Sequence, residues 1–200
     1  YYTPEVFEAL DEMVKNKKIR HYGVSVEKVE EGLKAIEYPG VSTIQIIFNM
    51  FRTRPAGLFF EQCKKKNIGI ICRVPLASGM LTGKMTKDST FATNDHRNYN
   101  REGKAFDVGE TFSGVSFEIG LTAVEKVKKI LPPGYSLPQM ALKWILMHDA
   151  VSTIIPGGKR PEQVIDNTKA SSLPELSDDV MKKVEAVYTE YIRPHIHQRW

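Results

Sequence analysis

The sequence predicts an α/β fold in which four parallel strands alternate with helices. Short β-branched, apolar segments alternate along the chain with segments whose apolar residues recur every three or four positions. A single long polar segment follows the third strand-like segment and is too long for a simple connection. Strands separated by helices need crossover connections, so this order implies a parallel sheet with flanking helices and one long loop.

The first half of the chain supplies three of the predicted strands and the helices between them. A helix over residues 4–15 begins with Pro4 in its first turn and repeats apolar residues at helical spacing. Strands are predicted at 19–25, 43–49 and 68–74, where β-branched and apolar residues dominate, and we expect the sheet to be covered on both faces. Helices at 26–38 and 56–66 connect these strands, and Pro75 ends the third strand.

The second half opens with the polar segment of residues 77–117, which we interpret as a functional loop, a lid or a mobile segment. Helices follow at 118–131 and 138–148, separated by a Pro-Pro-Gly turn. A short strand at 152–155 leads into a Gly-rich turn and a helix at 161–170. The last helix, 177–191, carries two aspartates in its first turn, where the helix dipole favours negative charge.

Composition excludes several classes of protein. The chain of 200 residues is 42% hydrophobic and 26% charged with a net charge of +4, which is ordinary for a globular domain. The lysines at 64–66 have no aromatic or arginine cluster beside them, so we expect a solvated face and no nucleic-acid partner. No stretch approaches the ~18 apolar residues of a membrane span. The two cysteines form no CxxC pair, which favours packed thiols in the reducing cytoplasm.

Polar residues at the carboxyl ends of the predicted strands are the candidate ligand-binding groups, because parallel α/β folds bind ligands there. Ser25, Gln45, Asn49 and Arg73 occupy such positions. The hydroxyl of Ser25 and the amide of Gln45 suit the donor and acceptor of a carboxamide. The three histidines at 148, 195 and 197 are interpreted as cap, surface or tail residues.

The turn after the last strand favours a phosphate. Gly157 and Gly158 let the backbone approach a ligand, Lys159 and Arg160 add positive charge, and the next helix begins with its N–H groups facing that spot. A flexible, solvated turn explains the same residues and stays open as an alternative. From the order of elements, an open doubly wound sheet and part of a (β/α)8 barrel both fit. No Rossmann or P-loop fingerprint follows any strand, which disfavours a Rossmann or P-loop fold.

Four motifs then occur in a familiar order: KIRHYGVS, TIQIIFN, IICRVPLASGMLTGK and STIIPGGKRPEQVIDN. In this order the chain resembles the C-terminal half of an aldo-keto reductase from Tyr1 to Trp200. The resemblance implies a partial (β/α)8 TIM barrel with strands 5 to 8, and one unit over residues 1–200. Within it, residues 76–118 would form the cofactor and substrate loop, and residues 177–200 the C-terminal helix and tail. Because Tyr1 is not Met, we expect the chain to begin inside a larger reading frame or to be processed.

The resemblance implies that NADP(H), rather than NAD(H), is the cofactor. Ser25 and Gln45 match residues at the nicotinamide carboxamide, although Val26 replaces the asparagine that usually follows the serine. Arg73 stands where many members place a tyrosine stacked on the nicotinamide, so its guanidinium would stack there or pair with the pyrophosphate. The stretch that wraps the pyrophosphate, mostly through backbone groups, matches Leu76, Ala77, Ser78, Gly79 and Leu81.

The adenosine end is assigned by the same resemblance. The loop that receives the 2′-phosphate matches Gly157, Gly158, Lys159 and Arg160. Gln163 stands where many relatives have an arginine, so the two cations before it would take over the charge. Asn167 matches the asparagine near the adenine, and an ordinary exposed helix residue is the alternative.

The family reduces aldehydes and ketones by hydride transfer, with an Asp/Tyr/Lys/His tetrad from the first half of the barrel. This chain has no DTAxxYG stretch, so we assign no catalytic residue and no metal ligand and expect the chain alone to be inactive. A non-catalytic dinucleotide-binding sensor or regulatory subunit of the same fold is the alternative, and a structural half-barrel that binds nothing is the third. The substrate of the parent protein would be a small carbonyl compound. The two outer strands should expose their edges beside apolar interior side chains and promote self-association.

Overall fold

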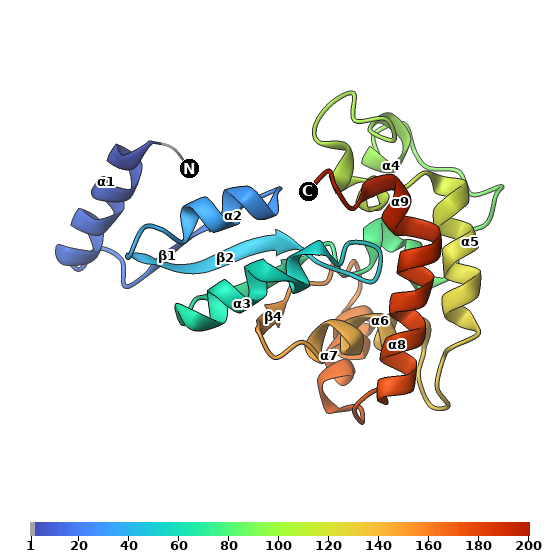
Figure 1. The fold of residues 1–200 in the computed structure, drawn as a ribbon. Coiled ribbons are helices and arrows are strands. Elements are labelled where there is room, and N and C mark those ends of the chain that lie inside the picture. Colours follow the sequence, from blue (N-terminus) through green and yellow to red (C-terminus); the bar gives the residue numbers. More distant parts are fainter. Residues whose placement is uncertain (1–2) are drawn as a thin grey trace.

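The fold is described by a computed structural model that covers residues 3–200; Tyr1 and Tyr2 of the predicted unit lie outside the described residues. One parallel sheet of four strands organises it, in the order β1-β2-β3-β4 (Figure 1). The strands are β1 (Tyr22–Ser25), β2 (Val41–Ile47), β3 (Gly69–Arg73) and β4 (Val151–Ile154). All four predicted strands are therefore confirmed, with ends that differ by a few residues.

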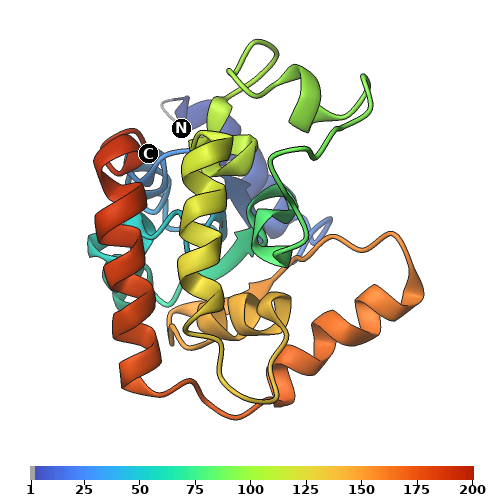
Figure 2. The same ribbon diagram turned by 90° about the vertical axis from the view of Figure 1, so that its right-hand side faces the viewer.

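The predicted helices are also present. They are α1 (Pro4–Lys15), α2 (Val29–Ala35), α3 (Leu58–Lys65), α5 (Phe117–Lys128), α6 (Leu137–Leu146), α7 (Pro161–Ser172) and α8 (Asp178–Val187). After α8 the chain continues through the π-helical turn η5 (Tyr188–Ile192) and α9 (Arg193–Ile196). α5 and α8 run side by side at one end of the molecule (Figure 2).

The long polar segment folds into short helical turns. They are η2 (Ala77–Thr82), α4 (His96–Tyr99), η3 (Val108–Glu110) and η4 (Phe112–Gly114); a further short turn, η1 (Arg54–Ala56), precedes α3. Figure 2 shows this segment arching over one end of the sheet. Buried residues such as Asn100 and Phe112 anchor it, so it is a packed part of the fold.

The sheet buries one face far more than the other, which corrects the expectation that both faces are covered. Ile44 and Ile46 of β2 are 0% and 1% exposed, and α2 and α3 pack on the sheet. The alternate residues Thr43 and Gln45 are half-buried, and Gly23, which pairs with Thr43, is exposed. Successive side chains of a strand point to opposite faces, so the open face carries mainly small and polar residues. The expected apolar interior side chains on this face include Ile47, which is fully buried, and Ile71, which is half-buried.

Within residues 3–200, β1 and β4 each pair with a neighbour on one side only, as predicted for the outer strands. Large apolar side chains lie exposed near these two edges. Val6 and Met13 belong to α1, which packs on β1 through Phe7 and Tyr22. Others lie at the end of β4 and on the following helix α7: Ile155, Val164 and Ile165. Self-association through these edges stays a prediction.

An aromatic cluster that includes His148 joins the helices to β2. The ring of His148 lies edge-on to Phe48, 4.9 Å between centroids, and its Nδ1 is 3.0 Å from the carbonyl oxygen of Trp144 in the last turn of α6. This contact fits the predicted cap, whereas the alternative of a surface residue is wrong, because the side chain is half-buried and burial lowers its pKa. Cys63 and Cys72 are free, buried thiols, as predicted, and burial raises the pKa of each to about 12. Between residues 3 and 200, no helix has the length and apolar character needed to span a bilayer.

Because the two faces of the sheet are unequally buried, substitutions on the two faces of β2 should lower the free energy of unfolding by different amounts. Ile44→Ala should lower the free energy of unfolding by about 2–5 kcal/mol, because it leaves a cavity under α2 and α3. Thr43→Ala, on the open face, should change it by about 0.5 kcal/mol or less. Urea denaturation followed by circular dichroism measures both. Equal losses would show that the face of Thr43 is covered after all.

Candidate functional site

A cavity of about 870 Å³ opens at the carboxyl ends of β3 and β4. Its size falls within the range of small-molecule and cofactor sites. The end of β3 with η2 forms one wall, α4 a second, and the turn before α7 a third. In Figure 2 the segment from β4 to α7 reaches outward, away from η2, at this end of the sheet.

The cavity brings together most of the residues predicted from the sequence. The predicted residues that line it are Leu76, Ser78, Gly79, Gly157, Gly158, Lys159, Gln163 and Asn167. Ala77 and Leu81 are fully buried, so their side chains belong to the core and only their backbone could meet a ligand. Arg160 is exposed beside the cavity without lining it.

The β3–η2 wall is built from strained backbone. Val74, Ala77 and Ser78 have φ angles of 52°, 48° and 56°, in the left-handed region that β-branched residues such as valine rarely adopt. The hydroxyl of Ser78 donates to the carbonyl oxygen of Glu110 at 3.1 Å and accepts from the N–H of Phe112 at 3.0 Å. The long segment therefore holds this turn in place, and such strain is typical of binding sites.

α4 forms the opposite wall through a short ion pair. Asp95 caps the helix by accepting from the N–H of Arg97 at 2.9 Å, and its Oδ2 lies 2.6 Å from Arg97 Nη2. The guanidinium also lies 4.5 Å from the ring of Phe91. The hydrogen bond from Arg97 is the main reason that the pKa of Asp95 falls below its usual range. Arg97 is thus already neutralised, and Lys84 and Lys159 are the other cationic residues that line the cavity.

The turn before α7 forms the third wall. In the first turn of α7 the N–H of Gln163 donates to the carbonyl oxygen of Arg160 at 3.0 Å, so this N–H is not free, contrary to the prediction. The side-chain oxygen of Gln163 accepts from the N–H groups of Lys159 at 2.8 Å and Arg160 at 3.1 Å. Asn167 Nδ2 donates to the carbonyl oxygen of Gly157 at 3.4 Å. Gln163 and Asn167 therefore shape the turn, and the exposed side chains of Lys159 and Arg160 remain as anion-binding groups. Gly157 has open space where a Cβ would stand, so a ligand can approach its backbone.

Ser25, Gln45 and Arg73 lie outside this cavity, at the carboxyl ends of the first three strands. Ser25 pairs with Gln45 in register, and Gln45 pairs with Ile71. These residues therefore share the open face of the sheet. Arg73 lies two residues beyond Ile71, so it projects from the same face roughly 7 Å farther along the strand. Asn49, the other predicted polar residue at this edge, is fully buried, and its Nδ2 donates to the carbonyl oxygen of Val74.

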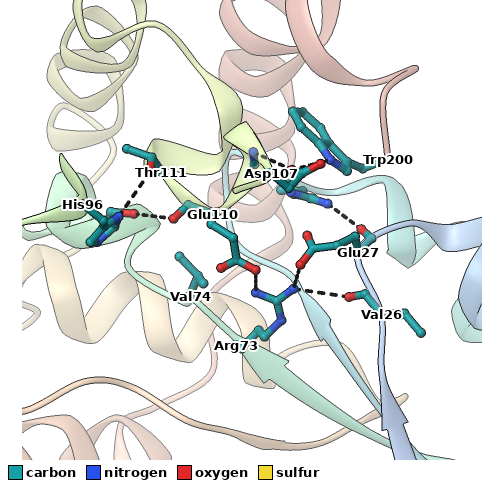
Figure 3. Close-up of polar contacts among 12 residues, drawn as sticks. Val26, Glu27, Arg73, Val74, His96, Asp107, Glu110, Thr111 and Trp200 are labelled. Carbon is teal, nitrogen blue, oxygen red and sulfur yellow. Dashed lines mark hydrogen bonds and ion pairs between the residues drawn. The ribbon is translucent and has the colours of Figure 1, made fainter. Parts of the chain in front are cut away.

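Arg73 is the centre of a cluster of charged groups (Figure 3). Its Nη2 lies 2.6 Å from Glu27 Oε1 and 3.3 Å from the carbonyl oxygen of Val26, and its Nη1 binds Glu110. The guanidinium is therefore neutralised by Glu27, which follows β1, and by Glu110 of η3. This corrects the expectation that it is free to pair with a pyrophosphate.

A second arginine links the same cluster to the C-terminal end. Arg52, only 2% exposed, donates through Nη2 to the carbonyl oxygen of Glu27 at 2.5 Å. Its guanidinium lies 4.3 Å from the centre of the Trp200 ring, whose Nε1 donates to Asp107 Oδ1 at 3.0 Å. Figure 3 shows Trp200 and Asp107 beside the pair of Arg73 with Glu27. These contacts hold η3 above the ends of β1 and β3.

Burial and mutual hydrogen bonding shift the pKa values of the two carboxyl groups of this cluster. Burial, then hydrogen bonding to Glu110, raises the pKa of Glu27 to about 7. Burial also acts to raise the pKa of Glu110, but hydrogen bonds from Glu27 and Arg73 outweigh it and lower that pKa. Three buried atoms have no hydrogen-bond partner among the described residues: Glu27 Oε2, Arg52 Nη1 and Arg73 Nε.

Sequence reasoning missed Glu27, Arg52 and Glu110. Glu27 lies two residues beyond Ser25, so its position after a strand was a usable signal. Glu110 lies 37 residues beyond Arg73, and no local pattern connects them. Among residues 3–200 no group of three His, Cys, Asp or Glu side chains is arranged to hold a metal ion.

Comparison with known proteins identifies the family of the chain. The model of the Aldo/keto reductase family matches residues 1–189. The chain is 29% identical over 184 residues to aldo-keto reductase yakc of Schizosaccharomyces pombe, whose name specifies NADP(+); the match covers 90% of this chain and 51% of that protein. It is 32% identical over 150 residues to a probable voltage-gated potassium channel subunit beta of Arabidopsis thaliana, with 70% of this chain and 42% of that protein covered.

Solved structures show the same fold. A glycerol dehydrogenase from Gluconobacter oxydans superimposes with a TM-score of 0.71 at 26% identity, and the match covers 94% of this chain and 53% of that one. Such neighbours are aldo-keto reductase barrels, so the predicted partial (β/α)8 barrel is confirmed. The chain spans about half the length of the curated relatives it matches.

The raised pKa of Glu27 predicts how stability depends on pH. The folded state holds the proton of Glu27 up to about pH 7, whereas the unfolded chain releases it near 4.5. The contribution of this group is thus fully present below pH 4.5 and is lost as the pH rises through 7. The stability of Glu27→Gln relative to the unaltered chain should therefore rise between pH 5 and pH 8, as measured by urea denaturation.

Glu102→Gln is the control for this titration. Glu102 lies on the same long segment, and its hydrogen bond from Lys104 lowers its pKa. The difference in stability between Glu102→Gln and the unaltered chain should stay constant from pH 5 to pH 8, because Glu102 is ionised throughout that range. A constant difference for Glu27→Gln as well would mean that Glu27 is also ionised at pH 5.

Proposed function

This chain belongs to the aldo/keto reductase family, and we propose that it is the cofactor-binding half of an NADP(H)-dependent enzyme that reduces aldehydes or ketones. The cavity beside two exposed cations is the observation that carries this proposal. We assign the four strands to positions 5 to 8 of the barrel and residues 1–200 to one C-terminal unit. The length of the match to curated relatives and the unpaired edges of β1 and β4 support that assignment.

The adenosine end of the cofactor fits the turn before α7. Gly157 and Gly158 offer backbone without side chains, and Gln163 and Asn167 hold that backbone in shape. Lys159 and Arg160 are exposed beside it and would bind a 2′-phosphate through charge-assisted hydrogen bonds. NADP(H) carries that phosphate and NAD(H) does not, which is why we propose NADP(H).

The pyrophosphate would cross the cavity between η2 and α4. Lys84 supplies positive charge there, while Arg97 is held by Asp95. Ser78 and Gly79 line the same wall, and Ser78 is fixed by the long segment. Residues 76–118 therefore serve as the cofactor and substrate loop in this proposal.

The nicotinamide end would lie at the carboxyl ends of β1 to β3. Ser25 and Gln45, paired across two strands, would hold the carboxamide, and Arg73 would flank the ring from one step farther along the sheet. When bound, NADPH supplies a hydride for carbonyl reduction. The proton of the new alcohol needs a general acid. We propose that this acid lies in the other half of the barrel, together with the carbonyl-binding site.

A regulatory role is the second candidate. The identity of 32% to a probable potassium channel subunit beta shows that relatives of this chain include proteins named as channel subunits. A dinucleotide bound without turnover would then act as a signal. The two free, buried thiols are compatible with a cytoplasmic location in either case.

The proposed cofactor site predicts selective loss of NADPH binding. In calorimetric titrations the chain should bind NADPH more tightly than NADH. The double variant Lys159→Ala, Arg160→Ala should weaken NADPH binding about 10- to 100-fold, because two charge-assisted hydrogen bonds to phosphate are lost, and should leave NADH binding nearly unchanged. Lys169→Ala is the matched control, since Lys169 lies on α7 outside the cavity. Failure to bind either dinucleotide would refute the proposal.

The chain by itself should not catalyse carbonyl reduction. A preparation that binds NADPH should show no steady consumption of NADPH when an aldehyde or ketone is added, as followed by absorbance. The physical reason is the missing general acid, without which hydride transfer to a carbonyl is strongly disfavoured. Consumption that increases in proportion to the protein concentration would contradict the assignment of the acid to the other half.

A further inference from the structure

We infer that the cluster of Glu27, Arg73 and Glu110 sets the relative affinity of the site for oxidised and reduced nicotinamide. The inference rests on the proposed function, because it places the nicotinamide beside Ser25 and Gln45. It concerns charge at that position, and none of the three residues is assigned a proton-transfer step. We call these residues the carboxylate–arginine cluster.

The cluster lies two residues farther along the strands than Ser25 and Gln45, the residues proposed to bind the carboxamide. Gln45 pairs with Ile71 and Ile47 with Arg73, so Arg73 extends the same row of side chains on the open face of the sheet. Glu27 lies two residues after Ser25, beyond the end of β1, and contacts Arg73. Glu110 reaches the guanidinium from η3. A ring seated between Ser25 and Arg73 would therefore lie within several ångströms of all three charges.

The two forms of the cofactor differ by one charge at the ring. Oxidised nicotinamide is a cation and reduced nicotinamide is neutral, so a lone arginine beside the ring would disfavour the oxidised form. Here two carboxylates face that arginine. Two further charged groups adjoin this cluster: Arg52, which contacts the backbone of Glu27, and Asp107, which binds Trp200. With Glu27 ionised, this set of groups carries one net negative charge, which favours the oxidised ring.

Burial strengthens this effect. The side chain of Arg73 is 12% exposed, and the unpartnered Glu27 Oε2 and Arg73 Nε are shielded from water. Charges in such surroundings interact more strongly than on a surface. Glu27 titrates near pH 7, facing Arg73 of β3, Glu110 and Asp107 of the η3 region, and Arg52 after β2. Its protonation would cancel the net negative charge and shift the preference toward reduced cofactor.

The test compares the dissociation constants of NADP+ and NADPH for the full chain. For Glu110→Gln the ratio of the NADP+ constant to the NADPH constant should rise about five- to tenfold, because one carboxylate near the cationic ring is removed. Glu102→Gln, on the same segment and paired with Lys104 in solvent, should leave the ratio unchanged. The ratio is the decisive readout, since a merely structural defect would weaken both cofactors alike.

The unaltered chain provides a second measurement that needs no variant. Between pH 8 and pH 6 its ratio should rise as Glu27 takes up a proton, and Glu27→Gln should remove this dependence. If Glu110→Gln does not fold, the pH dependence of this ratio in the unaltered chain tests the inference instead. Equal weakening of both cofactors in Glu110→Gln, or a ratio in the unaltered chain that is independent of pH, overturns the inference and leaves the proposed cofactor site intact. Absence of binding by the unaltered chain overturns both.

Discussion

The ion pairs of Arg73 are the interaction on which the arrangement of the site depends. One guanidinium at the end of β3 binds Glu27, just after β1, and Glu110 of η3. Breaking such a half-buried pair leaves an uncompensated charge, so these contacts resist separation. They place η3 over the rim of the sheet, and the carbonyl oxygen of Glu110 then accepts from Ser78. The strained turn that forms one wall of the cavity is thus coupled to the charge cluster.

The site combines two regions with different physical characters. The cavity between η2, α4 and the turn before α7 is open and lined by lysines, as suits phosphate groups. The ends of β1 to β3 carry Ser25, Gln45 and a nearly neutral arrangement of buried charges, as suits an uncharged or singly charged ring. An extended dinucleotide has these two characters at its two ends. The open face of the sheet below Gln45 would receive the other half of a barrel.

Local patterns predicted much of the fold because each element is specified by its own residues. The β-branched run that forms β2 and the proline and apolar spacing that form α1 predicted those elements directly. Candidate residues such as Ser78, Lys159 and Asn167 were predicted from motifs and now line one cavity. The partners of Arg73 and Gln163 were not predicted: Arg73 pairs with Glu27 and Glu110, and Gln163 accepts from the backbone before α7. Their partners are decided by packing around them, and a motif does not encode that packing.

The sequence by itself determined the order of strands and helices, the glycine and lysine content of the phosphate turn, and the family. Only the tertiary structure decided which charges meet. Glu27 and Glu110 are distant in the chain, and their shared arginine lies on a third segment, so their contact exists only after β1, β3 and η3 have assembled. The one-sided burial of the sheet has the same origin. The one-sided burial depends on the helices that pack against the sheet. Alternation of side chains along a strand separates two faces but does not specify which of them is covered.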